Sequence, residues 1–90
     1  MRSPAYAGQF RRDAKRMQKR GKDMAKLRTV IEMLLAAEAL PPRLKDHPLS
    51  GDWAGFRDCH VEPDWVLVYK IDSDRLILAR TGTHSDLFKR

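Results

Sequence analysis

The chain contains three histidines, and each lies where a turn or the end of a strand is expected. His47 lies in the segment DHPL, His60 begins HVEPDW, and His84 ends RTGTH. Histidine changes charge near neutral pH, so an imidazole serves both as a proton donor and as a proton acceptor. Together with Asp64 and Arg80, the histidines would supply the acid, the base and the cationic stabiliser that phosphodiester cleavage needs. The pattern predicts a small RNA-cutting enzyme.

The spacing of these residues predicts that they meet at one end of a sheet. His60 is expected at the end of one strand and Asp64 near the start of the next, across a turn that contains Pro63. The two side chains are predicted to face each other, and a carboxylate beside an imidazole orients the ring and raises its pKa. Arg80 is expected to end a third strand, after which a glycine lets the chain turn His84 back toward the same place.

Each of these residues also has a simpler interpretation. A single histidine near a turn is more often a surface or hydrogen-bonding residue than a catalyst. Asp64 would also anchor a turn, and Arg80 would also form a surface ion pair of little energetic value. Three histidines and an aspartate would bind zinc, but they lie on separate turns without a paired motif such as HxxxH. We therefore expect no metal and no other cofactor.

The single cysteine, Cys59, precedes His60 and raises the alternative of a thiol nucleophile. Neighbouring residues on a strand point to opposite faces, so we expect Cys59 to pack within the sheet instead. One cysteine excludes an intrachain disulfide and a multi-cysteine zinc cluster, and it fits a reducing compartment.

Length and composition suit one compact domain over residues 1–90, because 42% of the residues are hydrophobic. No stretch approaches the length of a transmembrane helix, and the N-terminus lacks the apolar segment of a signal peptide. A cytoplasmic protein without a membrane partner is the expectation.

Positive charge is concentrated at the start of the chain. Residues 1–28 contain ten Lys or Arg and two acidic residues, whereas residues 29–90 contain eight basic and ten acidic residues. Such a field attracts nucleic acid or an acidic protein in a salt-dependent way. Six of the basic residues are predicted to contact an RNA backbone: Arg11, Arg12, Lys15, Arg16, Lys19 and Arg20.

Two helices are predicted in the first half of the chain. Phe10, Ala14 and Met17 form one apolar stripe at helical spacing, which Gly21 ends. A second helix is expected from an Asp23 cap through residue 39, before a pair of prolines. Because few residues join them, the helices should form an antiparallel hairpin.

In the second half of the chain, apolar runs between turn signals predict strands at residues 56–61, 65–71 and 76–81. Short turns favour an antiparallel meander, and residues 3–7 are a possible edge strand. The central run, WVLVY, is apolar without alternation, as expected of a strand that is covered on both faces. The fold class is α+β, with the helical pair covering one face of the sheet and the other face more open.

Several motifs resemble one bacterial family. The segments KDHPL, GFRD, HVEPDW and RTGTH, followed by Leu87 and Phe88, are similar to the YafQ branch of the RelE-type toxins. The likeness extends along nearly the whole chain, and HxxPDW with RTGTH at this separation is a specific signal.

The resemblance implies a toxin of a type II toxin-antitoxin system that acts as a ribosome-dependent mRNA endonuclease. It also implies two N-terminal helices packed on a small antiparallel sheet, the RelE-like toxin fold. Family catalysis maps onto four residues of this chain: His47, His60, Asp64 and His84. Arg80 and Phe88 match family positions that handle the substrate.

From these observations we expect metal-independent cleavage of mRNA in the decoding site, with a ribose 2′-hydroxyl attacking the adjacent phosphate and His84 as general acid. The implied partners are the ribosome, mRNA and a separately encoded, DinJ-like antitoxin. Two other functions stay open: a toxin of the same fold that inhibits DNA gyrase without nuclease activity, and a plain RNA-binding module.

Overall fold

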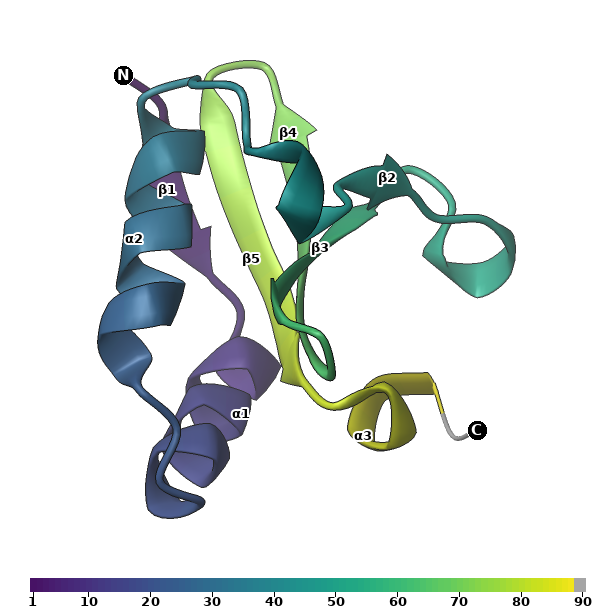
Figure 1. Cartoon of the computed structure of the whole chain (residues 1–90). Coiled ribbons are helices and arrows are strands. Elements are labelled where there is room, and N and C mark those ends of the chain that lie inside the picture. Colours follow the sequence, from purple (N-terminus) through teal and green to yellow (C-terminus); the bar gives the residue numbers. More distant parts are fainter. Residues whose placement is uncertain (89–90) are drawn as a thin grey trace.

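The computed structural model describes residues 1–88, which form an α+β fold of five strands and three helices (Figure 1). Two short 3₁₀ helices flank β2: η1 (Pro42–Leu44) lies between α2 and β2, and η2 (Gly51–Trp53) lies between β2 and β3. The helices and strands in chain order are β1 (Ser3–Tyr6), α1 (Gly8–Lys19), α2 (Met24–Leu35), β2 (His47–Pro48), β3 (Arg57–Glu62), β4 (Trp65–Asp72), β5 (Arg75–Gly82) and α3 (His84–Phe88).

The strands form one sheet in the order β1-β5-β4-β3-β2. The meander from β3 to β5 is antiparallel, as predicted, and β2 extends it. β1 lies parallel to β5, so the prediction of a wholly antiparallel sheet was wrong. The direction of β1 follows from α1, which comes next and carries Asp13 to Arg80 and Thr81 near the end of β5. A strand that delivers α1 to that end must run the same way as β5.

The central strand β4 is buried on both faces, as its unbroken apolar run predicts. Trp65, Leu67 and Tyr69 face the helices and join the larger core. Val66 and Val68 face the other way and form a smaller core with Leu87 of α3. The larger core holds the buried apolar side chains of both N-terminal helices: Phe10, Met17, Leu27, Val30 and Leu34.

Helix α1 follows its prediction, because Gly21 has φ 86° and ends the helix in the left-handed conformation. Helix α2 begins at its Asp23 cap, which accepts a hydrogen bond from the Ala25 N–H at 3.0 Å. It ends at Leu35, four residues before the predicted end, so that boundary was wrong. Ala37 has φ 58°, and its N–H and that of the next residue bond back to carbonyls of the last turn. Arg2 also donates to this end of the helix, from its N–H to the Leu35 carbonyl and from Nη1 to the Leu34 carbonyl, which Ala37 shares.

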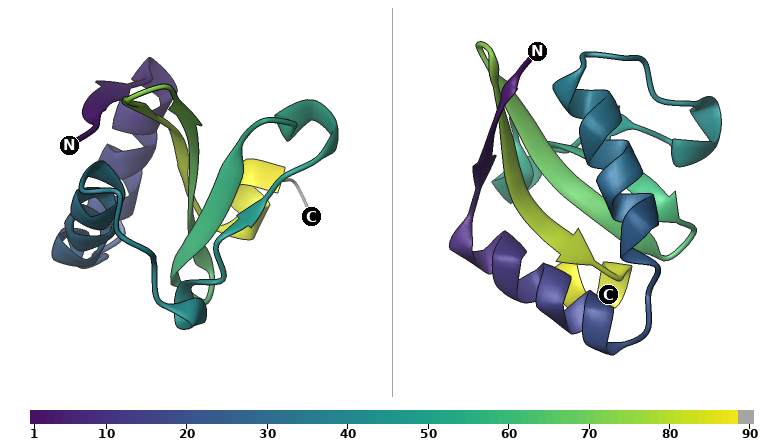
Figure 2. Two further views of the ribbon diagram at one scale, coloured as in Figure 1. Left: turned by 90° about the horizontal axis from the view of Figure 1, so that it is seen from above. Right: turned by 90° about the vertical axis from the view of Figure 1, so that its left-hand side faces the viewer.

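The two N-terminal helices diverge from their shared turn and each packs on the sheet (Figure 2). The predicted antiparallel hairpin was therefore wrong, while the prediction that the pair covers one face of the sheet was right. Within the described residues, α3 and the segment between β2 and β3 lie on the other face (Figure 2). Within residues 1–88, no helix is long and apolar enough to cross a membrane.

Candidate active site

Strand register brings the three histidines together on the face opposite the helices. Asp58 and His60 are two residues apart on β3, so both point to this face. β2 pairs His47 directly with Asp58. His60 pairs with Val66 of β4, which pairs with Gly82 of β5, so the chain just after Gly82 lies beside His60. The rings of His60 and His84 approach edge to face with centroids 5.2 Å apart.

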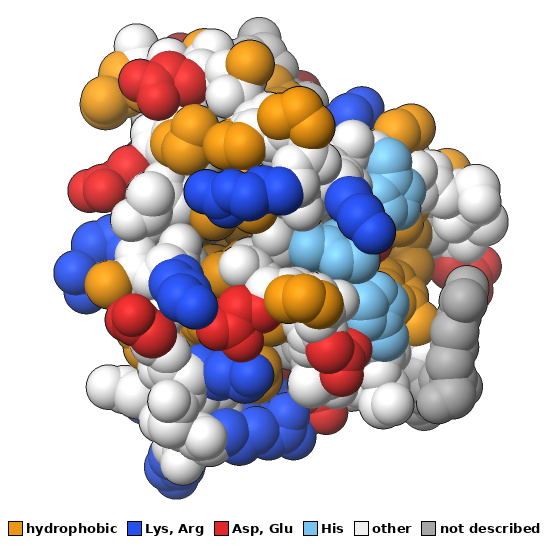
Figure 3. All heavy atoms as spheres, in the orientation of Figure 1, with side chains coloured by type: hydrophobic (Ala, Val, Ile, Leu, Met, Phe, Trp, Pro, Cys, Tyr) orange, Lys and Arg blue, Asp and Glu red, His pale blue; other side chains and the backbone are white. Residues whose placement is uncertain are grey.

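These side chains line an open pocket of about 300 Å³. The histidines gather on one face of the molecule, with positively charged side chains beside them (Figure 3). Apolar groups complete the lining, and among them the ring of Phe88 lies 6.2 Å from that of His84. A pocket that combines imidazoles with aromatic walls suits an unstacked RNA base and its phosphate. Its lining includes His47, Trp53, Asp58, His60, His84 and Phe88.

Asp64 pairs with His84, so the predicted pairing of Asp64 with His60 was wrong. Asp64 Oδ1 lies 2.7 Å from His84 Nδ1 and accepts a hydrogen bond from the His84 backbone N–H at 3.1 Å. The cause is a register shift in β3 after His60, which carries the turn that holds Asp64 toward the start of α3. The hydrogen bond from His84 holds the pKa of Asp64 below its usual value. Asp64 is therefore charged at neutral pH and fixes the orientation of the His84 ring.

His47 is held by its own loop. Its Nδ1 lies 2.7 Å from the Lys45 carbonyl and 3.1 Å from Asp58 Oδ1, and the shorter contact has hydrogen-bond geometry. A carbonyl only accepts, so Nδ1 must carry the hydrogen and donate it. In the neutral ring, Nε2 then has a free lone pair. The Nδ1 of His84 is engaged in the same way, so both rings are left with Nε2 for a substrate.

Asp58 is a site residue that the sequence reading missed. It is 3% exposed, and its Oδ1 has no hydrogen bond to any residue in the described part of the chain. Burial raises the pKa of this carboxyl, and the charges of His47, His60 and His84 partly oppose that rise. The spacing of two residues between Asp58 and His60 was the available signal, because it places both on one face of a strand.

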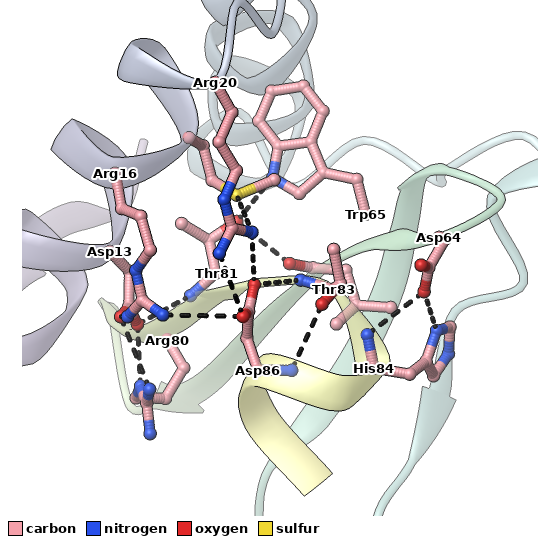
Figure 4. A network of polar contacts seen from close by, with 12 residues as sticks. Asp13, Arg16, Arg20, Asp64, Trp65, Arg80, Thr81, Thr83, His84 and Asp86 are labelled. Carbon is pink, nitrogen blue, oxygen red and sulfur yellow. Dashed lines mark hydrogen bonds and ion pairs between the residues drawn. The ribbon is translucent and has the colours of Figure 1, made fainter. Parts of the chain in front are cut away.

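Arg80 is not among the residues that line this pocket and belongs to a separate network of polar contacts (Figure 4). Its Nε and Nη2 donate to Asp13 of α1, at 2.6 and 3.3 Å. Asp13 is fully buried and also accepts from the Thr81 N–H at 3.2 Å. Burial is the strongest influence on the pKa of Asp13 and acts to raise it. Hydrogen bonds from Arg80, Gln9 and Thr81 together outweigh burial and hold that pKa below its usual value.

Sequence comparison identifies the group of proteins to which this fold and site belong. Residues 2–89 match the family described as bacterial toxins of type II toxin-antitoxin systems, YafQ. The chain belongs to the YafQ family of toxins. It is 51% identical over 84 residues to the mRNA interferase toxin YafQ of Escherichia coli K12, with 92% of this chain and 91% of that protein covered.

Solved structures of similar toxins share the fold. The E. coli YafQ in its complex with DinJ is 49% identical to this chain, with a TM-score of 0.90 over 98% of this chain and 99% of that one. A metal-bound toxin from Helicobacter pylori is 40% identical, with a TM-score of 0.91 over 98% of this chain and 100% of that one. The α+β architecture predicted from the sequence is thereby confirmed.

In this YafQ-family toxin, several of the α1 cations predicted to hold RNA are engaged within the protein. Arg20 forms two hydrogen bonds with Asp86 of α3, at 2.7 and 3.2 Å (Figure 4). Arg16 bridges Asp13 at 2.9 Å and Asp86 at 3.5 Å. The network attaches α3, which carries His84 and Phe88, to α1. Of the other predicted contacts, Arg12 bonds Gln9, Arg11 lies over the ring of Tyr6, and Lys15 and Lys19 are exposed.

The structure argues against Cys59 as a nucleophile. Cys59 is buried in the helix-side core, and burial raises the pKa of its thiol to about 12. A buried thiol that stays protonated is a poor nucleophile, so the packing role expected of Cys59 is confirmed.

Among residues 1–88, no three His, Cys, Asp or Glu side chains are grouped closely enough to hold a metal ion.

Proposed function

We propose that this toxin inhibits translation by cutting mRNA in the decoding site of the ribosome. The observation that carries the proposal is the pair of imidazoles, His47 and His84, each held through Nδ1 on opposite sides of His60 in one pocket. When Nδ1 of a histidine is held by a hydrogen bond, the ring tautomer is fixed and Nε2 is available for proton transfer. Acid–base pairs of this kind catalyse cleavage of RNA by its own 2′-hydroxyl.

In the proposed step, the ribose 2′-oxygen attacks the adjacent phosphorus and the bond from phosphorus to the 5′-oxygen breaks. His47 Nε2 accepts the proton of the 2′-hydroxyl. His84, whose Nδ1 is held by Asp64, donates a proton from Nε2 to the departing 5′-oxygen. The products are a 2′,3′-cyclic phosphate and a 5′-hydroxyl, and no metal takes part. His60 lies between the two rings and contacts the phosphate in this scheme.

Arg80 and Phe88 complete the proposed site. Asp13 engages Nε and Nη2 of Arg80, and Nη1, which has no contact with Asp13, would offset charge on the phosphorane-like transition state. The Phe88 ring provides a stacking surface for a base next to the cut.

We also propose that a separately encoded antitoxin silences the toxin in the cytoplasm. The E. coli relative has been crystallised with DinJ, and a partner of that kind would suit the basic first third of this chain. An acidic segment would speed association through long-range attraction, while apolar contacts would keep dissociation slow.

The alternatives are a gyrase inhibitor of the same fold and a plain RNA-binding module. A protein that only blocks an enzyme or binds RNA has no need of two imidazoles anchored through Nδ1 in one pocket. Neither alternative predicts new RNA ends.

Expression in bacteria tests the proposal. We expect the wild-type chain to stop growth and to produce new 5′ ends within coding regions, mapped by primer extension. His60→Ala and His84→Ala should restore growth and remove those ends, while the exposed Glu38→Ala should behave as wild type. Full toxicity in both well-folded histidine variants would reject the nuclease function.

A further inference from the structure

A second hollow adjoins the histidine pocket and shares His60 with it. It has a volume of about 310 Å³ and is lined on one side by Arg43, Leu44 and Lys45 of the η1 region. Pro63 and Glu62 line the other side. A third hollow of about 270 Å³ continues past Arg43 toward Lys26 of α2. Neighbouring hollows share lining residues, so the three follow one another with the histidines at one end.

The middle hollow is positively charged. The one acidic residue in its lining, Glu62, accepts from Lys22 and Lys26 at 3.0 Å each, so its charge is already matched. Over residues 1–88, Arg43 and Lys45 form no ion pair or side-chain hydrogen bond, and both are exposed. Positively charged side chains border the histidines on this face (Figure 3).

The position of Lys45 is fixed by the backbone. Its N–H donates to the Pro42 carbonyl at 3.0 Å, and the residue has φ 51° and ψ 43°, the left-handed conformation. That conformation is uncommon for a residue with a Cβ. The Lys45 carbonyl is also the acceptor for His47 Nδ1. The same backbone segment thus orients a pocket imidazole and presents a cation to the adjoining hollow.

Two cations of α1, Arg16 and Arg20, are less available than Arg43 and Lys45. Arg16 and Arg20 bind carboxylates of the fold, and releasing them would loosen α3. Arg43 and Lys45 can bind phosphate without breaking a contact of the described structure. A single RNA strand that enters the histidine pocket must continue past one of its edges, and the hollow at the His60 edge is lined by Arg43 and Lys45.

From these observations we propose that Arg43 and Lys45 form a subsite for a backbone phosphate of the RNA strand next to the cut. The inference rests on the proposed nuclease function and adds to it the direction in which the substrate leaves the site. The strand runs from the histidine pocket across His60 toward η1.

Binding to ribosomes programmed with a defined mRNA tests the subsite. The mRNA carries a 2′-O-methyl group at the cleavage position, so it lacks the attacking hydroxyl and stays intact. The test variant is Arg43→Gln with Lys45→Gln, which removes two charges and keeps a flexible polar side chain at each position. Arg28→Gln with Arg75→Gln removes the same charge from α2 and from the far end of β5. Arg43→Gln alone leaves the left-handed residue unchanged and guards against a folding effect.

We expect the test variant to bind about ten-fold more weakly than wild type, since two exposed cations each contribute up to about five-fold. The slope of log Kd against log salt concentration should become shallower by about 0.7, the value for one phosphate of a single strand. The single Arg43→Gln variant should show a smaller loss in the same direction, and the control should match wild type.

Methylphosphonate substitution then identifies the phosphate. One neutral linkage beside the cleavage position should weaken binding of the wild-type toxin and leave binding of the test variant unchanged. If the test variant binds the programmed ribosomes as tightly as the control variant does, the proposed subsite is wrong. Weaker binding without such a coupled position would assign the cations to ribosomal RNA and would also overturn it. Cleavage of unmodified mRNA is scored separately, so a wild-type toxin that binds without cutting would reject the nuclease function and not the subsite.

Discussion

Replacing Asp13 by Asn tests the network that holds α1 against the active-site end of the sheet. The carboxylate is fully buried and accepts five hydrogen bonds, two from Arg80 and one each from Arg16, Gln9 and the Thr81 N–H. Removing one partner of a buried ion pair costs about 3–5 kcal/mol, because the remaining charge is left uncompensated. The side chains of Arg80 and Arg16 are 22% and 41% exposed, so water recovers part of that energy. We therefore expect a loss of about 2–3 kcal/mol in the free energy of unfolding.

Urea denaturation at pH 7, followed by circular dichroism, measures this loss. For a chain of this size the same change lowers Tm by about 10–20 °C. Asp52→Asn is the matched control, since Asp52 is exposed, and it should shift stability by less than about 0.5 kcal/mol. A loss below about 1 kcal/mol for Asp13→Asn would refute the reasoning that the buried carboxylate balances Arg80.

Three further predictions concern the site and its supports. Asp64→Asn should lower the rate of mRNA cleavage about 100-fold with little change in stability, measured by single-turnover kinetics on programmed ribosomes, because His84 loses the carboxylate that orients it. The hydrogen bond from Arg20 holds the pKa of Asp86 below its usual 3.8. The charged carboxylate therefore stabilises the fold above that pH, and this stabilisation is lost as the pH falls below it. In Asp86→Asn, the free energy of unfolding should fall less steeply between pH 5 and pH 2. Cleavage should continue after a chelator removes transition metals, provided that magnesium is kept for the ribosome. Loss of activity that added metal restores would instead show that the site works as a metal centre. The metal-bound toxin from H. pylori makes this measurement worthwhile.

Local signals in the sequence predicted much of the fold. The apolar stripe of α1, the Asp23 cap and the short turns of the meander each depend on residues a few positions apart. The early end of α2 was not predictable in this way, because its last carbonyls are satisfied by Arg2, which lies 32 residues from Leu34 in the chain. The direction of β1 likewise depends on where α1 must dock, and residues 3–6 carry no information about that.

The site was predictable as a set of residues but not as a set of pairs. The motifs identified the three histidines and Asp64, and the structure brings the histidines into one pocket. The choice of imidazole that pairs with Asp64 depends on a register shift in β3, and the residue types there do not predict that shift. The α1 arginines were read as a free cationic surface because their carboxylate partner Asp86 lies 66 residues from Arg20. Net charge alone cannot distinguish a solvated cation from one that holds the fold together.

The chemistry of the RNA ends provides the most direct test of the central claim, that anchored imidazoles promote attack by the ribose 2′-hydroxyl. Purified toxin is added to ribosomes programmed with two mRNAs that differ only in a 2′-deoxy substitution on the ribose 5′ to the cut. The account predicts that the unmodified mRNA yields a 2′,3′-cyclic phosphate and a 5′-hydroxyl, and that the 2′-deoxy mRNA stays intact. Cleavage of both at the same rate, or a 3′-hydroxyl on the upstream fragment, would contradict it.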